Sequence, residues 1–311
     1  MLRKMVRILM GVVGVMLLIV TGLLVGFTIW RPSFISALET GSQVITTTRG
    51  EIEYTVEGQG TPYLYVHGSP GGYDQALTDR HVRPDAFVDL KTIAISRPGY
   101  LRTPLSSGKT PAEQADLFAA LLDEIDIDRV VVVAISGGGP AGLQFALRHP
   151  ERTEGLVLIA PAVTAQPDLR YENPTSASGT FMLDVILWAG GRWLGPAMIP
   201  GLDKEDPKEV ELARLLARSV IPLRSRTEGS VNDFDTLRTL GVESWPLEQL
   251  TVPTLILHGN VDRNAPYEGA VTVAARIPNA ELVTFDGIGH EISLTRAREI
   301  DEEMHRFIDG L

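Results

Sequence analysis

The sequence predicts an α/β fold in which a mostly parallel sheet has helices on both faces, a helical insertion and an N-terminal transmembrane helix. Two patterns predict it: short apolar segments that alternate with segments of helical periodicity, and 23 consecutive uncharged residues near the start of the chain. The composition, with 44% hydrophobic and 22% charged residues and no Cys, excludes a disordered protein or a disulfide scaffold.

The uncharged segment from Ile8 to Trp30 is long enough to cross a membrane. As an α-helix it would extend roughly 35 Å, which covers the hydrocarbon core of a bilayer. We therefore assign residues 1–30 to a basic flank and a single-pass transmembrane anchor, and residues 31–43 to a linker. A cleaved signal peptide is the alternative, but its apolar region usually has about 7 to 15 residues and ends at a small-residue site, which is absent after Trp30.

Charge is unevenly distributed along the chain. Arg3, Lys4 and Arg7 precede the apolar segment, with no acidic residue beside them. Because basic flanks stay in the cytoplasm, we expect a cytoplasmic N-terminus and a folded domain on the non-cytoplasmic side. Removing these three from the 28 basic residues leaves 25 against 39 acidic ones, a net charge of −14. This acidity excludes nucleic acid as an expected partner, since phosphate binding needs a concentrated positive face.

Short apolar segments between turn residues are predicted as strands, the first two as a hairpin and the others as the interior of a sheet. The predicted strands are residues 43–48, 52–57, 63–66, 92–96, 130–135, 155–160, 254–258 and 282–285. The predicted helices are residues 111–125 with Thr110 as N-cap, 138–148 and 293–308.

An apolar, helical insertion interrupts this alternation and carries Trp188, Trp193 and Trp245. Ligands in open α/β sheets bind beyond the carboxyl ends of the strands, so we interpret the insertion as a lid over that edge. A small helical subdomain with its own core would account for the same residues. We therefore expect a core formed by residues 44–163 and 246–311, and a lid formed by residues 164–245.

Ser136 stands between a predicted strand and a predicted helix, with small residues two positions before and after it, Ala134 and Gly138. This is the spacing of a nucleophile elbow, a strained turn that exposes a serine hydroxyl and leaves room only for small side chains. The glycines after Ser136 also spell GxGxxG, a dinucleotide-binding pattern. That pattern needs an acidic residue about twenty positions on, whereas the next strand leads into Pro161 without a carboxylate.

A glycine-rich turn at residues 67–72 follows an earlier predicted strand. Such a turn can present backbone N–H groups to a developing negative charge. We expect the N–H groups of Ser69 and Gly137 to form an oxyanion hole, assisted by the positive end of the helix after Ser136. A plain tight turn is the alternative, and we expect His67 to shape this turn rather than to act as a base.

The loops after the last two predicted strands carry an acid and a base, Asp262 and His290. In a Ser-Asp-His triad the imidazole takes the serine proton, and the carboxylate holds the imidazole in the right tautomer. Asp286 is a competing acid, but its position at a strand exit favours a role in shaping the turn. No HExxH or comparable ligand spacing occurs, so we expect no metal and no cofactor.

Over about residues 44–311 the chain resembles the α/β-hydrolase fold family. The motifs are HGSPGG from residue 67, SRPGY from 96, AISGGG from 134, HGNVDRNAP from 258 and GIGH from 287. The resemblance implies that Ser136 is the nucleophile, Asp262 the acid and His290 the base, with Ser69 and Gly137 as oxyanion donors. It is greatest for the lidded branch with esterases, proline iminopeptidases, epoxide hydrolases and haloalkane dehalogenases, and the last two use Asp at the elbow.

These observations predict a membrane-anchored serine hydrolase that acts through an acyl-enzyme on a carboxylic ester with an apolar part. The apolar insertion motivates the choice of an ester, and the lipid bilayer is the expected partner of the N-terminal helix. One alternative is an aminopeptidase of the proline iminopeptidase type, whose usual HGGPG motif differs here at Ser69. Another is a catalytically silent binding or scaffold protein that retains the fold.

Overall fold

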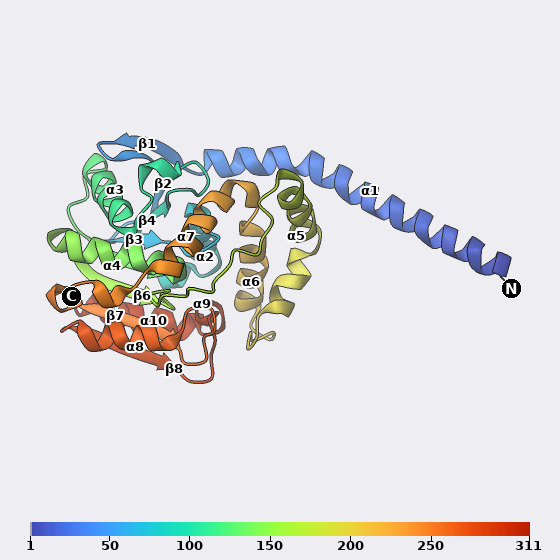
Figure 1. Cartoon of the computed structure of the whole chain (residues 1–311). Coiled ribbons are helices and arrows are strands. Elements are labelled where there is room, and N and C mark those ends of the chain that lie inside the picture. The colour runs from blue at the N-terminus through green and yellow to red at the C-terminus, as the bar shows by residue number, and fades with distance from the viewer. Residues whose placement is uncertain (1) are drawn as a thin grey trace.

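The computed structural model describes residues 2–311 and contains a sheet of eight strands in the order β1-β2-β4-β3-β5-β6-β7-β8 (Figure 1). The pairs β1–β2 and β2–β4 are antiparallel and all other pairs are parallel. The strands are β1 Gln43–Thr47, β2 Gly50–Glu57, β3 Thr61–Val66, β4 Leu90–Ser96, β5 Val130–Ile135, β6 Thr153–Ile159, β7 Thr254–Gly259 and β8 Ala280–Phe285. The predicted mostly parallel sheet with an antiparallel entry hairpin is therefore confirmed.

Helices cover both faces of this sheet. They are α1 Leu2–Thr40, α2 Tyr73–Val82, α3 Pro111–Glu124, α4 Gly139–Arg148, α5 Ala177–Met198, α6 Pro207–Ser219, α7 Thr227–Thr239, α8 Tyr267–Arg276, α9 Ile292–Thr295 and α10 Ala297–Asp309. Thr110 caps α3 as predicted, because its side chain accepts a hydrogen bond from the Glu113 N–H. The predicted helix at 293–308 is divided at Arg296 into α9 and α10, and α2 and α8 were not predicted.

The central strand β5 shows how the core is built. Its side chains alternate between the two faces: Val130, Val132 and Ala134 lie in one apolar cluster, and Val131 and Val133 lie in the other. All five are at most 2% exposed. A parallel strand covered on both faces needs such an unbroken apolar run, which explains why the pattern predicted this strand well.

Helix α1 differs from the expected anchor followed by a linker at residues 31–43. It continues through Pro32 to Thr40, so most of the expected linker is helical. Apolar contacts hold the helix on both sides of the proline: Phe27 packs against α5, and Leu38 packs against the cluster of Tyr73 and Ala76. Packing against the domain overrides the cost of a proline inside a helix.

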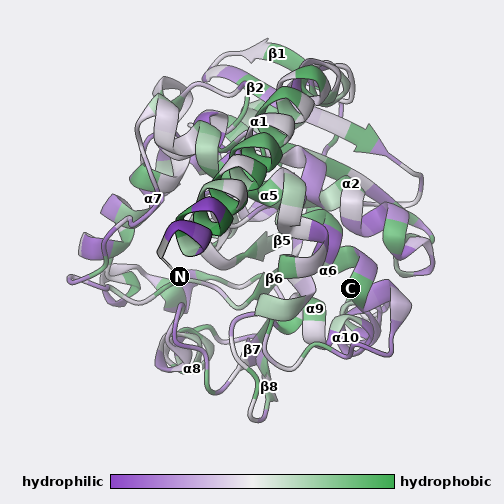
Figure 2. Cartoon of the chain, turned by 90° about the vertical axis from the view of Figure 1, so that its right-hand side faces the viewer, coloured by the Kyte–Doolittle hydropathy of each residue, from purple (hydrophilic) through white to green (hydrophobic). Residues whose placement is uncertain are grey.

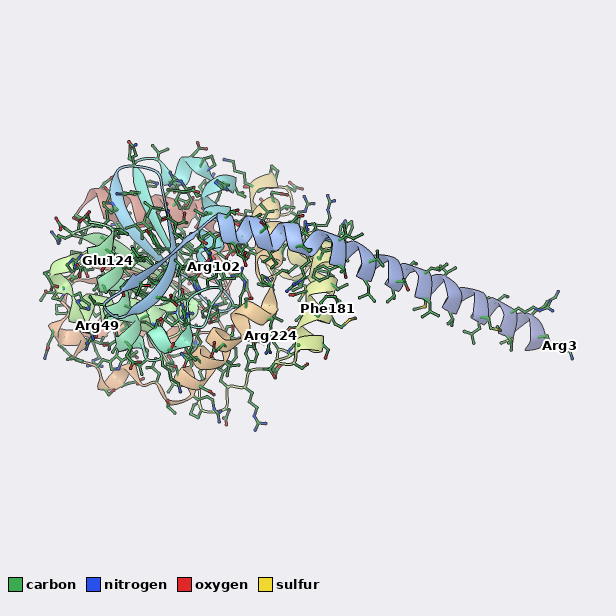
Figure 3. The ribbon with its side chains drawn as sticks, turned by 90° about the horizontal axis from the view of Figure 1, so that it is seen from above. Arg3, Arg49, Arg102, Glu124, Phe181 and Arg224 are labelled. Atoms are coloured by element: carbon green, nitrogen blue, oxygen red, sulfur yellow. The ribbon has the colours of Figure 1, made fainter. Side chains whose placement is uncertain are left out.

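The N-terminal half of α1 leaves the domain as a single exposed helix (Figures 1 and 3). Residues 3–23 are exposed throughout, and Arg3 marks the far end of the helix in Figure 3. This is the one helix among residues 2–311 that is long and apolar enough to cross a membrane.

Helices α5, α6 and α7 form the insertion between β6 and β7. Helix α5 packs against α6 and α1, and α6 packs against α2. The three insertion tryptophans do not form one block, as the sequence interpretation implied. Trp188 contacts α1, Trp193 is 65% exposed, and Trp245 packs against the main core beyond the insertion.

Candidate active site

Ser136 lies at the carboxyl end of β5 with a positive φ of 49°. An added Cβ at Gly138 would come within 2.5 Å of the Val66 carbonyl oxygen. The small residue two positions after Ser136 is therefore required by the close approach of β3. Such a strained turn is typical of functional serines, because it holds the hydroxyl clear of the strand and the following helix.

A continuous chain of hydrogen bonds links Ser136, His290 and Asp262. The Ser136 Oγ lies 2.9 Å from the His290 Nε2, and the His290 Nδ1 lies 2.7 Å from the Asp262 Oδ2. These residues follow β5, β8 and β7, whose carboxyl ends lie along one edge of the sheet. Residues that are up to 154 positions apart in sequence thus converge at one point.

Asp262 is fixed from several directions. Its Oδ1 accepts hydrogen bonds from the backbone N–H groups of Asn264 at 2.8 Å and Ala265 at 2.9 Å. Burial alone would raise the pKa of Asp262, but hydrogen bonds from His258 and His290 and the charge of His290 hold this pKa well below its usual value. The carboxyl group is therefore a stable anion beside the imidazole.

His258 is a second histidine on Asp262 that the sequence interpretation treated as an ordinary strand end. It is fully buried, and its Nε2 lies 2.9 Å from the Ala265 carbonyl oxygen and 3.2 Å from the Asp262 Oδ2. His258 precedes Asp262 by four residues. The segment between them is the turn after β7 and not a helix, so no sequence motif predicts their contact. His258 therefore orients the carboxylate from behind.

Asp286, the competing acid, lies in the turn after β8 and shapes it. Its Oδ1 accepts a hydrogen bond from the Asn260 side chain at 2.9 Å, and the Asn260 Oδ1 accepts from the Gly287 N–H at 2.8 Å. The carboxylate that accepts the hydrogen bond of His290 is Asp262 instead.

The turn at residues 67–72 lies directly over Ser136. A Cβ at Gly68 would lie 3.0 Å from the Ser136 Cβ, and a Cβ at Gly137 would lie 2.7 Å from the Ser69 Oγ. The two expected oxyanion donors, Ser69 and Gly137, are therefore neighbours beside Ser136. Within residues 2–311, the backbone N–H of Ser69 donates no hydrogen bond to a protein acceptor.

His67 does not face the serine. It is fully buried, its Nδ1 lies 2.7 Å from the Gly68 carbonyl oxygen, and its Nε2 accepts a hydrogen bond from the Arg97 N–H at 2.9 Å. Burial, together with the Arg97 charge, lowers the pKa of His67 well below its usual value. The ring is therefore neutral and holds the turn in place.

A buried ion pair supports the same turn from the insertion. Arg97 donates to the His67 carbonyl oxygen at 2.7 Å and to both carboxylate oxygens of Asp233 in α7. Asp233 also accepts hydrogen bonds from Ser69 and Tyr100. Sequence reasoning missed Asp233, since it lies in no motif and is 136 positions from Arg97.

Two pockets border the Ser136–His290 pair. The large pocket, of about 610 Å³, is lined by loop and insertion residues that include Gln166, Arg170, Phe234 and Arg263. The small pocket, of about 190 Å³, is lined by Gln75 and by Leu212 and Leu216 of α6. Ser69, Ser136 and His290 line both pockets.

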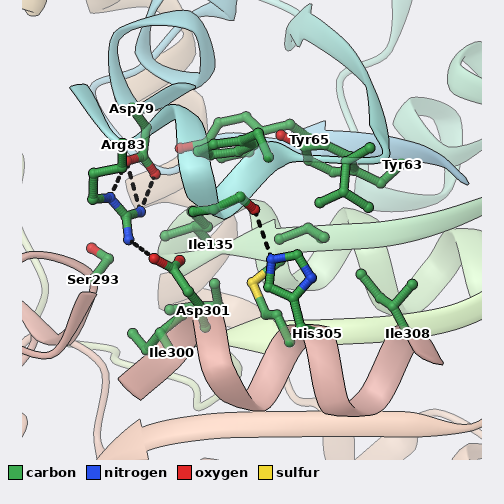
Figure 4. Close-up of a pocket in the computed structure, with 16 residues that line it drawn as sticks. Tyr63, Tyr65, Asp79, Arg83, Ile135, Ser293, Ile300, Asp301, His305 and Ile308 are labelled. Carbon is green, nitrogen blue, oxygen red and sulfur yellow. Dashed lines mark hydrogen bonds and ion pairs between the residues drawn. The ribbon is translucent and has the colours of Figure 1, made fainter. Parts of the chain in front are cut away.

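A further cavity, of about 40 Å³, adjoins the small pocket and shares four lining residues with it, Tyr65, Asp79, Ile135 and Ser293 (Figure 4). At one end Arg83 pairs with both Asp79 and Asp301. Burial, helped by the nearby Asp79, raises the pKa of Asp301 to about 6 in spite of the opposing Arg83 charge. This acidic group therefore titrates within the folded protein at mildly acidic pH.

Among residues 2–311, no group of three or more His, Asp or Glu side chains is arranged to hold a metal ion. The polar groups around Ser136 instead engage one another in hydrogen bonds. The arrangement can move a proton from a hydroxyl to an imidazole beside a preformed cluster of N–H groups.

The sequence and the fold are similar to those of several known hydrolases. The chain is 39% identical to the uncharacterized hydrolase YcgS of Bacillus subtilis over 124 residues, which are 40% of this chain and 42% of that protein. It is 25% identical to a 2-hydroxy-6-oxononadienedioate/2-hydroxy-6-oxononatrienedioate hydrolase of Cupriavidus pinatubonensis over 289 residues, which are 86% of this chain and 95% of that protein.

A solved α/β hydrolase fold protein from Nakamurella multipartita superposes with a TM-score of 0.73 and 30% sequence identity, covering 86% of this chain and 98% of that chain. The family model described as alpha/beta hydrolase fold matches residues 62–297, which include Ser136, Asp262 and His290. With its sheet order, its strained serine turn and this match over most of its length, the chain belongs to the α/β-hydrolase fold family.

Proposed function

We propose that this protein is a membrane-anchored serine hydrolase that cleaves carboxylic esters through an acyl-enzyme. The observation that carries the proposal is the unbroken hydrogen-bond chain from Ser136 through His290 to the Asp262 anion, next to two pockets. A structural serine would not need a strained turn, two bordering pockets and an imidazole at 2.9 Å.

The chemical steps follow from this geometry. His290 Nε2 takes the hydroxyl proton as the Ser136 Oγ attacks the ester carbonyl carbon, and the carbonyl oxygen becomes an oxyanion. The N–H groups of Ser69 and Gly137 stabilise that charge. The C–O bond to the alcohol then breaks, and His290 returns the proton to the leaving oxygen. Water attacks the acyl-enzyme by the same route and releases the acid.

The pockets support an ester with one apolar part. Leu212 and Leu216 give the small pocket an apolar wall, which suits an alkyl acyl or alcohol group. The large pocket takes the remainder of the substrate beneath the insertion, which supports the interpretation of α6 and α7 as parts of a lid.

A second candidate is hydrolysis of a dicarboxylate, because the name of the Cupriavidus relative gives 2-hydroxy-6-oxononadienedioate as a compound that protein hydrolyses. The specific observation in its favour is that Arg170 and Arg263 both line the large pocket. Guanidinium groups pair with carboxylates through two parallel hydrogen bonds. Asp168 and Glu172 line the same pocket, however, and balance the two positive charges.

Membrane anchoring rests on α1. Its apolar part is exposed in the folded chain, which would be costly in water for so many large apolar side chains. A bilayer covers that surface. The basic residues before Ile8 favour a cytoplasmic N-terminus, with the catalytic domain on the other side.

A fluorophosphonate probe tests the proposed chemistry on the detergent-solubilised full-length protein. We expect covalent labelling of the wild type, none of Ser136→Ala, and full labelling of the control Ser106→Ala, whose serine is exposed and lines neither pocket. Ester turnover should fall by about 10⁴-fold or more in Ser136→Ala. Folded wild type that resists the probe would instead be a silent binding protein.

A substrate panel separates the remaining alternatives. We expect short and medium p-nitrophenyl esters to be cleaved faster than aminoacyl amides and faster than 2-hydroxy-6-oxononadienedioate. A preference for the amide would favour the aminopeptidase, and a preference for the dienedioate would favour the dicarboxylate hydrolase. Protease added to intact cells tests on which side of the membrane the domain lies. We expect the protease to cleave the domain from outside.

A further inference from the structure

Helix α5 presents an apolar face to the outside of the molecule. Met182, Ile186 and Trp193 lie within about 40° of one another around the helix, and they are 46%, 52% and 65% exposed. Leu194 and Met198 are also exposed, but they lie about 120° and 160° from Met182 around the helix and face another side. We call Met182, Ile186 and Trp193 the α5 outer face.

Charge is nearly absent from α5. Its only charged residues are Asp184 and Arg192. Asp184 is buried and accepts a hydrogen bond from the Leu223 N–H at 2.9 Å, while the Arg192 guanidinium lies over the Trp193 ring. The exposed side of the helix thus carries large apolar groups with a single cation.

Helix α5 lies where α1 leaves the domain. Phe27 of α1 contacts Phe181 and Trp188 of α5, with ring centroids 5.3 and 5.8 Å apart, and Trp30 lies 5.9 Å from Trp188. In Figure 1 α5 runs across α1 on the side of the domain from which α1 projects, and Figure 2 shows this side with α1 toward the viewer.

The length of α1 locates the bilayer relative to this aromatic cluster. Arg7, the last basic residue before the apolar segment, and Phe27 are separated by twenty residues, which is roughly 30 Å of helix. That distance equals the thickness of a hydrocarbon core. Tryptophan gathers at the boundary between hydrocarbon and water, so Trp30 and Trp188 lie at the level of the second membrane surface.

We propose that the α5 outer face lies in the surface of the bilayer that α1 spans, in contact with lipid. This inference rests on the proposed membrane anchoring and extends it from a tether to a docking surface. The segment that contains α5 and α6, residues 177–226, carries seven basic and six acidic residues, whereas the whole chain has a net charge of −11. This nearly neutral segment fits a membrane surface better than the acidic remainder of the domain does.

The docking surface lies close to the proposed active site. Helix α5 packs on α6, and Leu212 and Leu216 of α6 line the small pocket beside Ser136. Only α5 and α6 therefore lie between lipid and the pocket assigned to the apolar part of the ester. This arrangement favours amphipathic esters that reside in the bilayer as substrates.

The absence of Cys from the chain makes a direct test possible. Ile186→Cys, Trp193→Cys and a control, Val271→Cys on the exposed side of α8, each carry the fluorophore NBD. The full-length variants are reconstituted into phosphatidylcholine–phosphatidylglycerol vesicles with and without doxyl-labelled lipid as quencher. Circular dichroism confirms that each variant is folded. A fourth variant, Leu18→Cys, reports whether α1 itself enters the bilayer.

We expect doxyl lipid to quench the labels at positions 186 and 193 at least threefold more than the label at 271. Quenching at 18 without quenching at 186 and 193 would overturn the docking surface and leave the anchor intact. Absence of quenching at position 18 would overturn both. Labels on α5 that are shielded from aqueous iodide but insensitive to doxyl lipid would show that protein, such as a second copy, covers the face, and would also overturn the proposal.

Discussion

Replacing Asp233 by Asn tests how the insertion supports the turn over Ser136. One carboxylate oxygen of Asp233 accepts hydrogen bonds from Arg97, Tyr100 and Ser69, and the other accepts from the Arg97 Nη1 at 2.9 Å. Asn has nearly the same shape, but its amide NH₂ cannot accept these bonds. The substitution also leaves the Arg97 guanidinium without its counter-charge.

The size of the expected loss of stability follows from the burial of this ion pair. The side chains of Arg97 and Asp233 are only 1% and 7% exposed, so solvent screens the pair little. Removing one partner of a buried pair costs about 3–5 kcal/mol, and we expect Asp233→Asn to lower the free energy of unfolding by that amount. Because Ser69 loses an anchor and its N–H is a proposed oxyanion donor, kcat should fall by about 10²-fold or more.

Urea unfolding and ester kinetics of the detergent-solubilised full-length protein measure both effects. Asp235→Asn is the matched control, since Asp235 lies on the same helix, is 65% exposed and is 3.7 Å from Arg238. Its loss should stay below about 1 kcal/mol. The double variant Arg97→Met/Asp233→Leu should regain stability without regaining activity, because Arg97 also holds the His67 carbonyl oxygen.

Equal losses of stability in Asp233→Asn and Asp235→Asn, together with an unchanged kcat in both, would refute this reasoning. The ion pair would then be a passive neighbour of the turn.

Three further predictions concern the same region. Asp262→Asn should lower kcat by about 10⁴-fold without unfolding the protein, because the imidazole of His290 loses the partner that sets its tautomer; stopped ester assays measure this loss. In Gly259→Ala the new Cβ would lie 2.3 Å from the Ile288 carbonyl oxygen, so the loop before His290 must shift, and we expect a loss of about 1–3 kcal/mol in urea unfolding and of most activity. Asp301 has its pKa raised from 3.8 to about 6 by burial. The wild type should therefore lose about 3 kcal/mol of stability as the pH rises from about 4 to about 6, a loss that Asp301→Asn lacks, as urea unfolding at pH 4 and pH 7 can show.

Specific outcomes would contradict these expectations. Wild-type kcat in Asp262→Asn would remove Asp262 from the mechanism. A Gly259→Ala variant as stable as a Gly11→Ala control, whose added Cβ meets nothing within 4 Å, would show that the loop yields at no cost. A parallel pH dependence of stability in wild type and Asp301→Asn would show that Asp301 is not the titrating group.

The sequence by itself determined the elements whose signals are local. The apolar run of β5 and the cap at Thr110 were predictable because a few consecutive residues specify them. Ser136, Asp262 and His290 were also chosen from short motifs at strand ends. Parallel strands bring such ends to one edge of a sheet, so the topology explains why these three residues meet.

Only the tertiary structure decided the contacts between distant side chains. Asp233 and His258 carry no local pattern, and their roles appear only when folding buries a charge or a ring beside its partner. The continuation of α1 past Pro32 likewise depends on packing against α5 and Tyr73, which helix propensity cannot report. Local pattern specifies an element, whereas burial against another element determines where it ends and what its side chains do.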